Sequence, residues 1–139
     1  MSPNAGDLSG AVGLVTGGVS GIGAAITAEL RGHGAIVVAV DKSAHPGAAP
    51  ASSKTAPAQS GWEAAGDVRD FAMMCGISGK VRDEFGRLDF VVANAGITDW
   101  GSMSDGDPQR WRDVIDTNVL GVLVTVTDHE VRSRQFIAG

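Results

Sequence analysis

The sequence predicts an α/β fold, a doubly wound parallel sheet of the Rossmann type. Three observations indicate this fold: an apolar run that ends in glycines, a helical pattern directly after them, and a second apolar run that ends in an acidic residue. Because the connections are short, the two strands should be parallel with a right-handed crossover. We expect one partial domain over 1–139, truncated after about four strands and four helices.

The first β-α-β unit covers residues 11–41. Residues 11–15 form an apolar run, a glycine-rich turn follows, and from Ile22 the apolar residues recur at helical spacing. The β-branched run 36–40 predicts the second strand, and Asp41 stands at its end.

The glycines between the first strand and the helix have physical roles at this spacing. A strand that turns directly into a helix needs backbone at positive φ and room for a ligand, which suits Gly17 and Gly21. Gly23 would let the helix pack closely on the strand. The helix start favours a diphosphate, and the Asp41 carboxylate can accept hydrogen bonds from a ribose diol. Alternatively, the glycines only form a turn and Asp41 is a solvated strand end.

The rest of the chain continues the alternation of strands and helices. The expected elements are a flexible surface loop over 42–60, a third strand over 62–66, a helix over 70–85, a fourth strand over 90–93, a loop over 97–106, a helix over 107–126 and a polar tail over 127–139.

Several local features refine these elements. The helix over 70–85 has one apolar face that predicts core packing, formed by Phe71, Met74, Ile77, Val81 and Phe85. Gly76 and Gly79 predict imperfect helicity there. The nearly all-apolar strand over 90–93 should be buried on both faces. Asp107 followed by Pro108 predicts the start of the last helix.

The glycine spacing, written Thr16-Gly17-x-x-x-Gly21-Ile22-Gly23, resembles the short-chain dehydrogenase/reductase family. Asn94-Ala95-Gly96 after the fourth strand is similar too, as is the Asn-x-x-Gly pattern that begins at Asn118. The resemblance covers residues 10–126. It implies a cofactor site formed by Thr16, Gly17, Ser20, Gly21, Ile22, Gly23, Asp41, Asp67, Val68, Asn94, Ala95 and Gly96.

The resemblance assigns roles that compete with simpler ones. Asp67 and Val68 would contact the adenine ring, although Asp67 could instead, or also, cap the helix that begins near Arg69. Asn94 would stabilise the sheet beside the cofactor, or merely end a strand. Asn118 would be a catalytic residue that holds a water linking the active-site lysine to solvent, or an ordinary asparagine satisfied by solvent or a neighbouring carbonyl.

The catalytic half of the family pattern is absent from this sequence. In the family a strand with a catalytic serine and a helix with Tyr-x-x-x-Lys follow, whereas this chain contains no tyrosine. Hydride transfer to a carbonyl needs a proton donor at the oxygen. We therefore expect an oxidoreductase half that is inactive alone and whose full-length parent takes a small alcohol or carbonyl substrate. The alternative is a non-catalytic nucleotide-binding or regulatory fragment.

The cofactor expected from Asp41 is NAD rather than NADP. A carboxylate at the end of the second strand would bond the ribose hydroxyls of NAD and repel the 2′-phosphate of NADP. Lys42, which follows it, could soften that discrimination.

Composition excludes several classes of partner. The net charge is −5 and the basic residues are scattered, which argues against nucleic acid. The apolar runs are far shorter than the roughly 20 residues that span a bilayer, no secretory signal is visible, and the histidines with Cys75 form no metal-ligand pattern. We therefore expect a cytoplasmic protein without nucleic-acid, membrane or metal partners. The family resemblance, in which the corresponding helix often lies at a subunit interface, implies a homo-oligomer formed through the apolar face of the helix over 107–126.

Overall fold

The computed structural model describes residues 6–45, 61–102 and 104–127. Most of the predicted surface loop over 42–60 and nearly all of the predicted tail over 127–139 lie outside these residues. The elements are β1 (Val12–Thr16), α1 (Gly21–Gly32), β2 (Ile36–Asp41), β3 (Glu63–Ala65), α2 (Phe71–Phe85), β4 (Phe90–Ala93), α3 (Pro108–Ile115), the π-helical turn η1 (Asp116–Leu120) and α4 (Gly121–Thr127).

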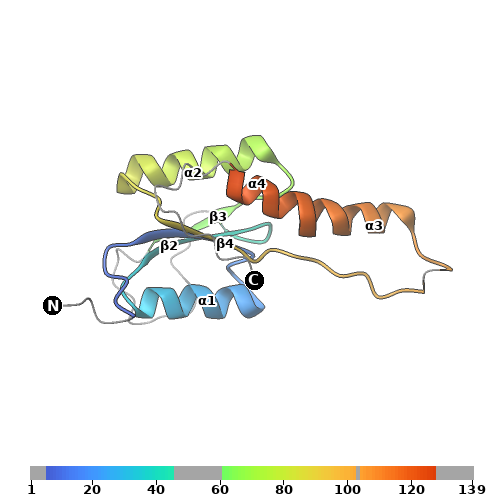
Figure 1. Cartoon of the computed structure of the whole chain (residues 1–139), viewed down its shortest axis with the longest axis horizontal. Coiled ribbons are helices and arrows are strands. Elements are labelled where there is room, and N and C mark those ends of the chain that lie inside the picture. Colours follow the sequence, from blue (N-terminus) through green and yellow to red (C-terminus); the bar gives the residue numbers. More distant parts are fainter. Residues whose placement is uncertain (1–5, 46–60, 103, 128–139) are drawn as a thin grey trace.

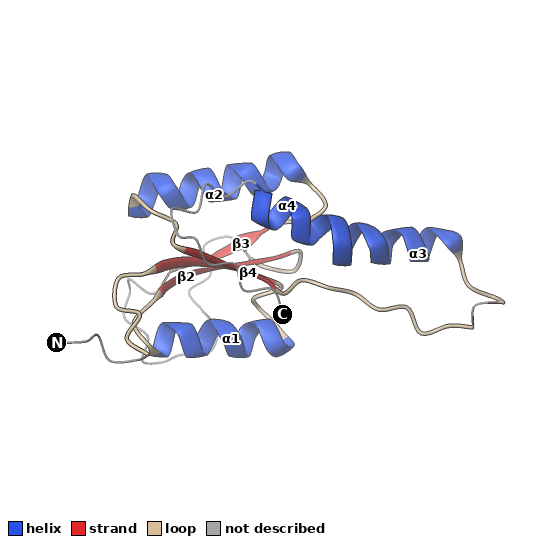
Figure 2. Ribbon diagram, viewed as in Figure 1, coloured by secondary structure: helices blue, strands red, loops and turns tan. Residues whose placement is uncertain are grey.

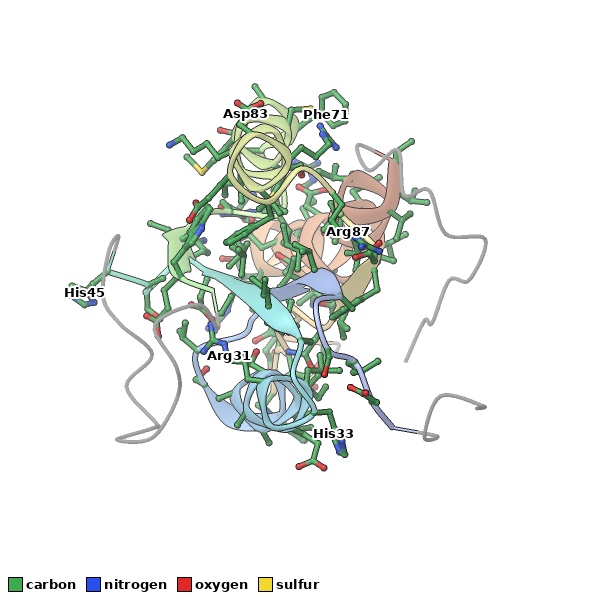
Figure 3. All side chains as sticks on the ribbon, turned by 90° about the vertical axis from the view of Figure 1, so that its left-hand side faces the viewer. Arg31, His33, His45, Phe71, Asp83 and Arg87 are labelled. Carbon is green, nitrogen blue, oxygen red and sulfur yellow. The ribbon has the colours of Figure 1, made fainter. Side chains whose placement is uncertain are left out.

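The four strands form one parallel sheet in the order β3-β2-β1-β4. Helix α1 covers one face of this sheet, and α2 and α4 cover the other (Figures 1 and 2). Figure 3 looks along the axes of α1 and α2 and shows them on opposite sides of the strands. The arrangement confirms the predicted Rossmann-type fold, with helices on both faces of a parallel sheet.

Alternation along the strands divides the core between these two faces. Leu14 and Val38 pack with Met74 of α2 in the larger cluster, and both Leu14 and Met74 are fully buried. Val15 and Val37 lie in the smaller cluster, against which the partly buried residues of α1 pack. Successive strand residues point to opposite faces, so a sheet covered on both sides needs the nearly continuous apolar strands seen in the sequence.

Two predictions about packing are wrong. All four residues of β4 are only half-buried, because β4 is an edge strand of the described sheet and has a neighbour on one side alone. Phe71, expected in the core, is 54% exposed at the first turn of α2, where the helix extends past the apolar cluster.

Helix α2 is continuous, so the imperfect helicity expected at Gly76 and Gly79 is not observed. A Cβ on either glycine would meet nothing within 4 Å, which places both on an open side of the helix. The buried side chains of Met74, Ile77 and Val81 hold the opposite face on the sheet. Tertiary packing therefore outweighs the low helix propensity of glycine.

The predicted last helix forms, although it is divided. Asp107 caps α3 by accepting a hydrogen bond from the Gln109 N–H at 2.9 Å, with Pro108 in the first turn, as predicted. At Asp116 the helix widens into η1 and then continues as α4. Such π turns insert an extra residue into a helix and occur frequently at functional sites.

Candidate dinucleotide site

A cleft of about 340 Å³ lies at the carboxyl ends of the strands, where ligands bind in open α/β sheets. Its walls come from the segments that follow all four strands and from the π turn. The lining residues are Gly17, Ser20, Ile22, Gly23, Val40, Asp41, Lys42, Gly66, Asp67, Val68, Asn94, Ala95, Gly96, Ile97 and Thr117.

Most of the residues predicted for the cofactor site line this cleft. Thr16 and Gly21 do not line it, although both shape the adjoining turn. Asn118 does not line it either, but it is hydrogen-bonded to the lining residue Ile97. Sequence reasoning missed the lining residues Val40, Gly66, Ile97 and Thr117 and considered Lys42 only as a neighbour of Asp41. Each of the four is adjacent in sequence to a predicted site residue. For Val40, Gly66 and Ile97 the available signal was their place at the ends of strands, and for Thr117 it was only its neighbour Asn118.

The glycine turn after β1 has the conformation that its spacing predicts. Gly17 has φ +64° and Gly21 has φ +52°, a region that side chains rarely enter. A Cβ on Gly23 would stand 1.9 Å from the Gly17 carbonyl oxygen, so only glycine fits where α1 packs on the turn. A Cβ on Gly21 would meet nothing within 4 Å, and the first turn of α1 is therefore open to a ligand.

The residue before α1 leaves the helix start uncapped by a side chain. Ser20 has extended backbone and its side chain makes no capping hydrogen bond. Ile22 is 75% exposed at the mouth of the cleft instead of packing in the core. Backbone N–H groups of a first helical turn carry partial positive charge, which suits a diphosphate.

Thr16 and Asn94 tie the turn after β1 to the turn after β4. The Thr16 hydroxyl, which is buried, accepts hydrogen bonds from the N–H groups of Asn94 and Ala95, both at 3.1 Å. The Asn94 side-chain amide donates to the carbonyl oxygens of Thr16 at 3.1 Å and Gly17 at 3.3 Å. The Asn94 amide therefore does more than end a strand, because it fixes the glycine turn against β4.

Asp41 stands half-buried at the end of β2, on the wall of the cleft. Its Oδ1 accepts hydrogen bonds from the Ser43 N–H at 2.9 Å and the Ser43 hydroxyl at 2.7 Å. This local turn fixes the orientation of the carboxylate, and the structure records no partner for Oδ2 among the described residues.

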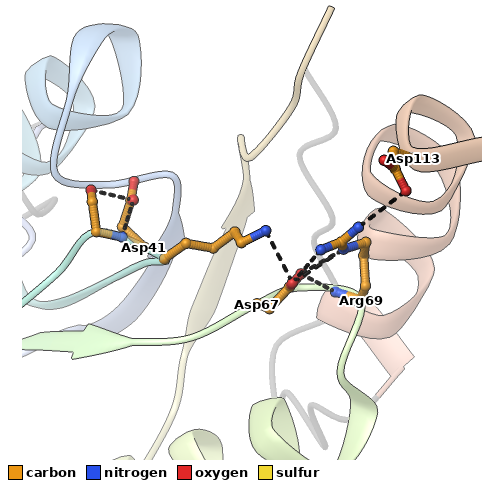
Figure 4. Close-up of polar contacts among 6 residues, drawn as sticks. Asp41, Asp67, Arg69 and Asp113 are labelled. Carbon is orange, nitrogen blue, oxygen red and sulfur yellow. Dashed lines mark hydrogen bonds and ion pairs between the residues drawn. The ribbon is translucent and has the colours of Figure 1, made fainter. Parts of the chain in front are cut away.

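Asp67 follows β3 and is the centre of a network of charged side chains (Figure 4). The Arg69 guanidinium donates to both of its oxygens, with Nη2 at 2.7 Å from Oδ2, and Lys42 Nζ lies 3.3 Å from the same oxygen. The hydrogen bonds from Arg69 hold the pKa of the Asp67 carboxyl well below its usual range, and Asp67 raises the pKa of Arg69 in return.

Asp67 does not cap α2, so that alternative is wrong. The cap is Asp70, whose side chain accepts a hydrogen bond from the Met73 N–H at 2.9 Å. Asp67 lies too early in the chain and instead closes a turn by accepting the Arg69 N–H at 3.0 Å. Its carboxylate therefore faces the cleft and the network of basic residues.

Asn118 lies in η1 and holds the chain that leaves β4. Its Oδ1 accepts from the Ile97 N–H at 2.9 Å, and its Nδ2 donates to the Ile97 carbonyl at 2.8 Å. Three residues later, a Cβ on Gly121 would stand 2.6 Å from the Val68 side chain, so glycine lets α4 approach the cleft wall. Asn118 and Gly121 are both poor helix formers, and hydrogen bonding explains the first and close packing the second in this helix. A catalytic role for Asn118 stays a prediction.

The parallel sheet, the glycine turn and the cleft at the strand ends together define a Rossmann-type α/β fold. A model of the short chain dehydrogenase family matches residues 11–130, and the chain belongs to this family.

Known proteins of this kind are similar in sequence and in structure. An uncharacterised oxidoreductase of Mycobacterium tuberculosis is 40% identical over 131 residues, which cover 86% of this chain and 47% of that protein. An uncharacterised NAD-dependent oxidoreductase of the same organism is 33% identical over 144 residues, which cover 91% of this chain and 50% of that protein. Carveol dehydrogenase from Mycobacterium avium, solved in complex with NAD, superposes with a TM-score of 0.71 at 30% identity. The match covers 88% of this chain and 49% of the carveol dehydrogenase chain.

The chain spans about half the length of the curated relatives it matches. Among the described residues, no helix is long and apolar enough to cross a membrane. The same part of the chain contains no group of three or more histidine, cysteine or acidic side chains placed to hold a metal ion.

Proposed function

We propose that this chain is the dinucleotide-binding part of a short-chain dehydrogenase/reductase whose complete form transfers hydride between a nicotinamide cofactor and a small alcohol or carbonyl. The observation that carries the proposal is the turn from Gly17 to Gly23, which opens the start of α1 toward the cleft and is fixed there by Asn94. Exposed N–H groups and glycine backbone suit a diphosphate that must approach the chain closely.

The proposed cofactor is NAD rather than NADP. Asp41 stands on the cleft wall beyond β2 with its orientation fixed by Ser43, so it can accept hydrogen bonds from ribose hydroxyls. A 2′-phosphate at the same place would meet a negative charge. The NAD-dependent relative and the NAD complex of carveol dehydrogenase support the same choice.

The proposed catalytic contribution of this chain is limited to Asn118. The sequence contains no tyrosine, the residue that supplies the proton in short-chain dehydrogenases. We expect the 139-residue chain to bind the cofactor without turning over an alcohol or a carbonyl. The complete protein is proposed to be cytoplasmic, with a homo-oligomeric contact through α3, η1 and α4.

Calorimetric titration of the chain with NADH and NADPH tests the cofactor assignment. Wild type should bind NADH more tightly than NADPH. Asp41→Ala should lower the affinity for NADH about tenfold, because two hydrogen bonds to the ribose are lost. The difference in affinity between NADH and NADPH should become smaller, because the repulsion of the 2′-phosphate is lost as well. Asp83→Ala, which removes an exposed carboxylate of α2, is the charge-matched control and should bind like wild type. Equal binding of NADH and NADPH by wild type would contradict the choice of NAD.

A further inference from the structure

The pairing between Arg69 and Asp67 is a fork that orients the carboxylate. Arg69 Nε lies 3.1 Å from both Asp67 oxygens, Nη2 lies 2.7 Å from Oδ2, and the Arg69 N–H binds Oδ1 at 3.0 Å. A planar guanidinium that binds both oxygens leaves a carboxylate one orientation, which a lysine could not do.

Arg69 is itself anchored from a distant part of the chain. Its Nη1 lies 3.5 Å from Asp113 Oδ1 on α3, so one side chain connects the turn after β3 with the helix that leads to Asn118 (Figure 4). The Arg69 and Asp67 side chains are 33% and 25% exposed, so the orientation of the pair depends on these hydrogen bonds rather than on burial. The geometry of the pair is therefore set by two elements of the fold.

The remaining partner of Asp67 is a side chain that can leave. Lys42 Nζ lies 3.3 Å from Asp67 Oδ2, and the Lys42 side chain is 65% exposed. An exposed lysine pair contributes little stability and exchanges readily with solvent. Because a carboxylate offers about four acceptor positions, the one held by Lys42 is available to an N–H donor inside the cleft.

We propose that Arg69 is a positioning residue for the adenine end of the cofactor. It holds the Asp67 carboxylate so that the oxygen contacted by Lys42 can accept a hydrogen bond from the exocyclic amino group of adenine, and Asp113 holds Arg69 in place. The inference rests on the proposed dinucleotide function and on the contact between Asp67 and adenine that the family resemblance implies. It adds to them a residue outside the predicted site, Arg69, and the dependence of base specificity on that residue.

The test compares NADH with reduced nicotinamide hypoxanthine dinucleotide, which carries an oxygen in place of the adenine amino group. Wild type should prefer NADH by about fivefold to tenfold, since one hydrogen bond to a charged group is at stake. In Arg69→Ala the preference should fall to near one, with the affinity for the hypoxanthine analogue unchanged. Arg69→Lys keeps the charge without the fork and should retain only part of the preference, as should Asp113→Asn.

The control variant is Arg87→Ala. Arg87 donates two hydrogen bonds to Asp89, a pair with the same residue spacing as Arg69 and Asp67. It precedes β4, at the amino ends of the parallel strands, whereas the cleft lies at their carboxyl ends. This variant should keep the full preference for adenine.

Each outcome decides between separate claims. The positioning role of Arg69 would be overturned if both Arg69 variants kept the preference for NADH, or if they lost affinity equally for NADH and for its analogue. A wild type that shows no preference would overturn the contact between Asp67 and adenine. An unchanged preference in Asp113→Asn would overturn the anchoring role of Asp113. A folded wild type that binds neither dinucleotide would instead contradict the proposed function itself.

Discussion

The side-chain amide of Asn118 forms two hydrogen bonds with the main chain of Ile97, accepting from its N–H at 2.9 Å and donating to its carbonyl at 2.8 Å. The pair joins the π turn to the segment that leaves β4, two places where the regular hydrogen-bonding pattern of the backbone is interrupted. Because Ile97 also lines the cleft, this side chain holds one part of the cleft wall in place.

Replacing Asn118 should therefore reduce stability. Asn118→Ala removes both hydrogen bonds, and we expect the free energy of unfolding in urea to fall by about 1–2 kcal/mol. Asn118→Asp keeps the acceptor and loses the donor. Its free energy of unfolding should therefore fall less at low pH, where the protonated carboxyl group can donate a hydrogen bond. An alanine variant as stable as wild type would show that the two contacts contribute nothing.

The glycine turn offers a matched pair of substitutions. Gly23→Ala places a methyl group 1.9 Å from the Gly17 carbonyl oxygen, and the overpacking should cost about 3 kcal/mol or more. Gly21→Ala meets no atom but requires φ +52°, which should cost about 1–2 kcal/mol. Urea unfolding of both variants measures the difference, and a Gly23 variant less affected than the Gly21 variant would contradict the packing described.

The Asp67 network should contribute stability that depends on pH. Its hydrogen bonds from Arg69 lower the pKa of Asp67 in the folded state, so the stabilisation is present above the ordinary carboxyl pKa of about 4 and is lost as the pH falls below it. Asp67→Asn should be less stable than wild type at pH 7, and the difference should shrink in acid. The control is Asp105→Asn, on an exposed loop. If the difference in unfolding free energy between wild type and Asp67→Asn were constant from pH 7 to pH 3, or equal to the difference for Asp105→Asn, the network would not contribute stability as described.

An apolar stripe along α3, η1 and α4 should mediate self-association. Ile115 and Leu123 are each 54% exposed, and Val119 lies between them at the same helical spacing. Exposed apolar side chains that gather on one side of a helix mark interaction sites. Sedimentation equilibrium should show oligomers that Leu123→Glu dissociates, whereas Phe71→Glu on α2, a position equally exposed, should leave them intact. Association unaffected by Leu123→Glu would place the contact elsewhere.

Local patterns predicted much of the fold. The strand, glycine turn, helix and acid from 11 to 41 follow from short-range sequence, because positive φ at Gly17 and a close approach at Gly23 are demands that few residues satisfy. The cap at Asp107 followed from the same kind of signal. Membership of the short-chain dehydrogenase family agrees with the motifs that carried the resemblance.

Features that depend on distant contacts could not be predicted. Arg69 and Asp113 are 44 positions apart, and nothing near either residue indicates the other. The Thr16 hydroxyl accepts a hydrogen bond from the Asn94 N–H 78 positions later, and the sequence around neither residue indicates this contact. The exposure of β4 follows from its place at the edge of the described sheet, and composition alone suggested a buried strand.

The most direct test of the account is a calorimetric titration of the purified 139-residue chain with NADH, accompanied by circular dichroism to establish that the chain is folded. We predict saturable binding of one NADH per chain, displaced by ADP-ribose because the contacts come from the adenosine and diphosphate end. A chain with a helical spectrum and a cooperative urea transition that shows no binding of NADH would contradict the central claim.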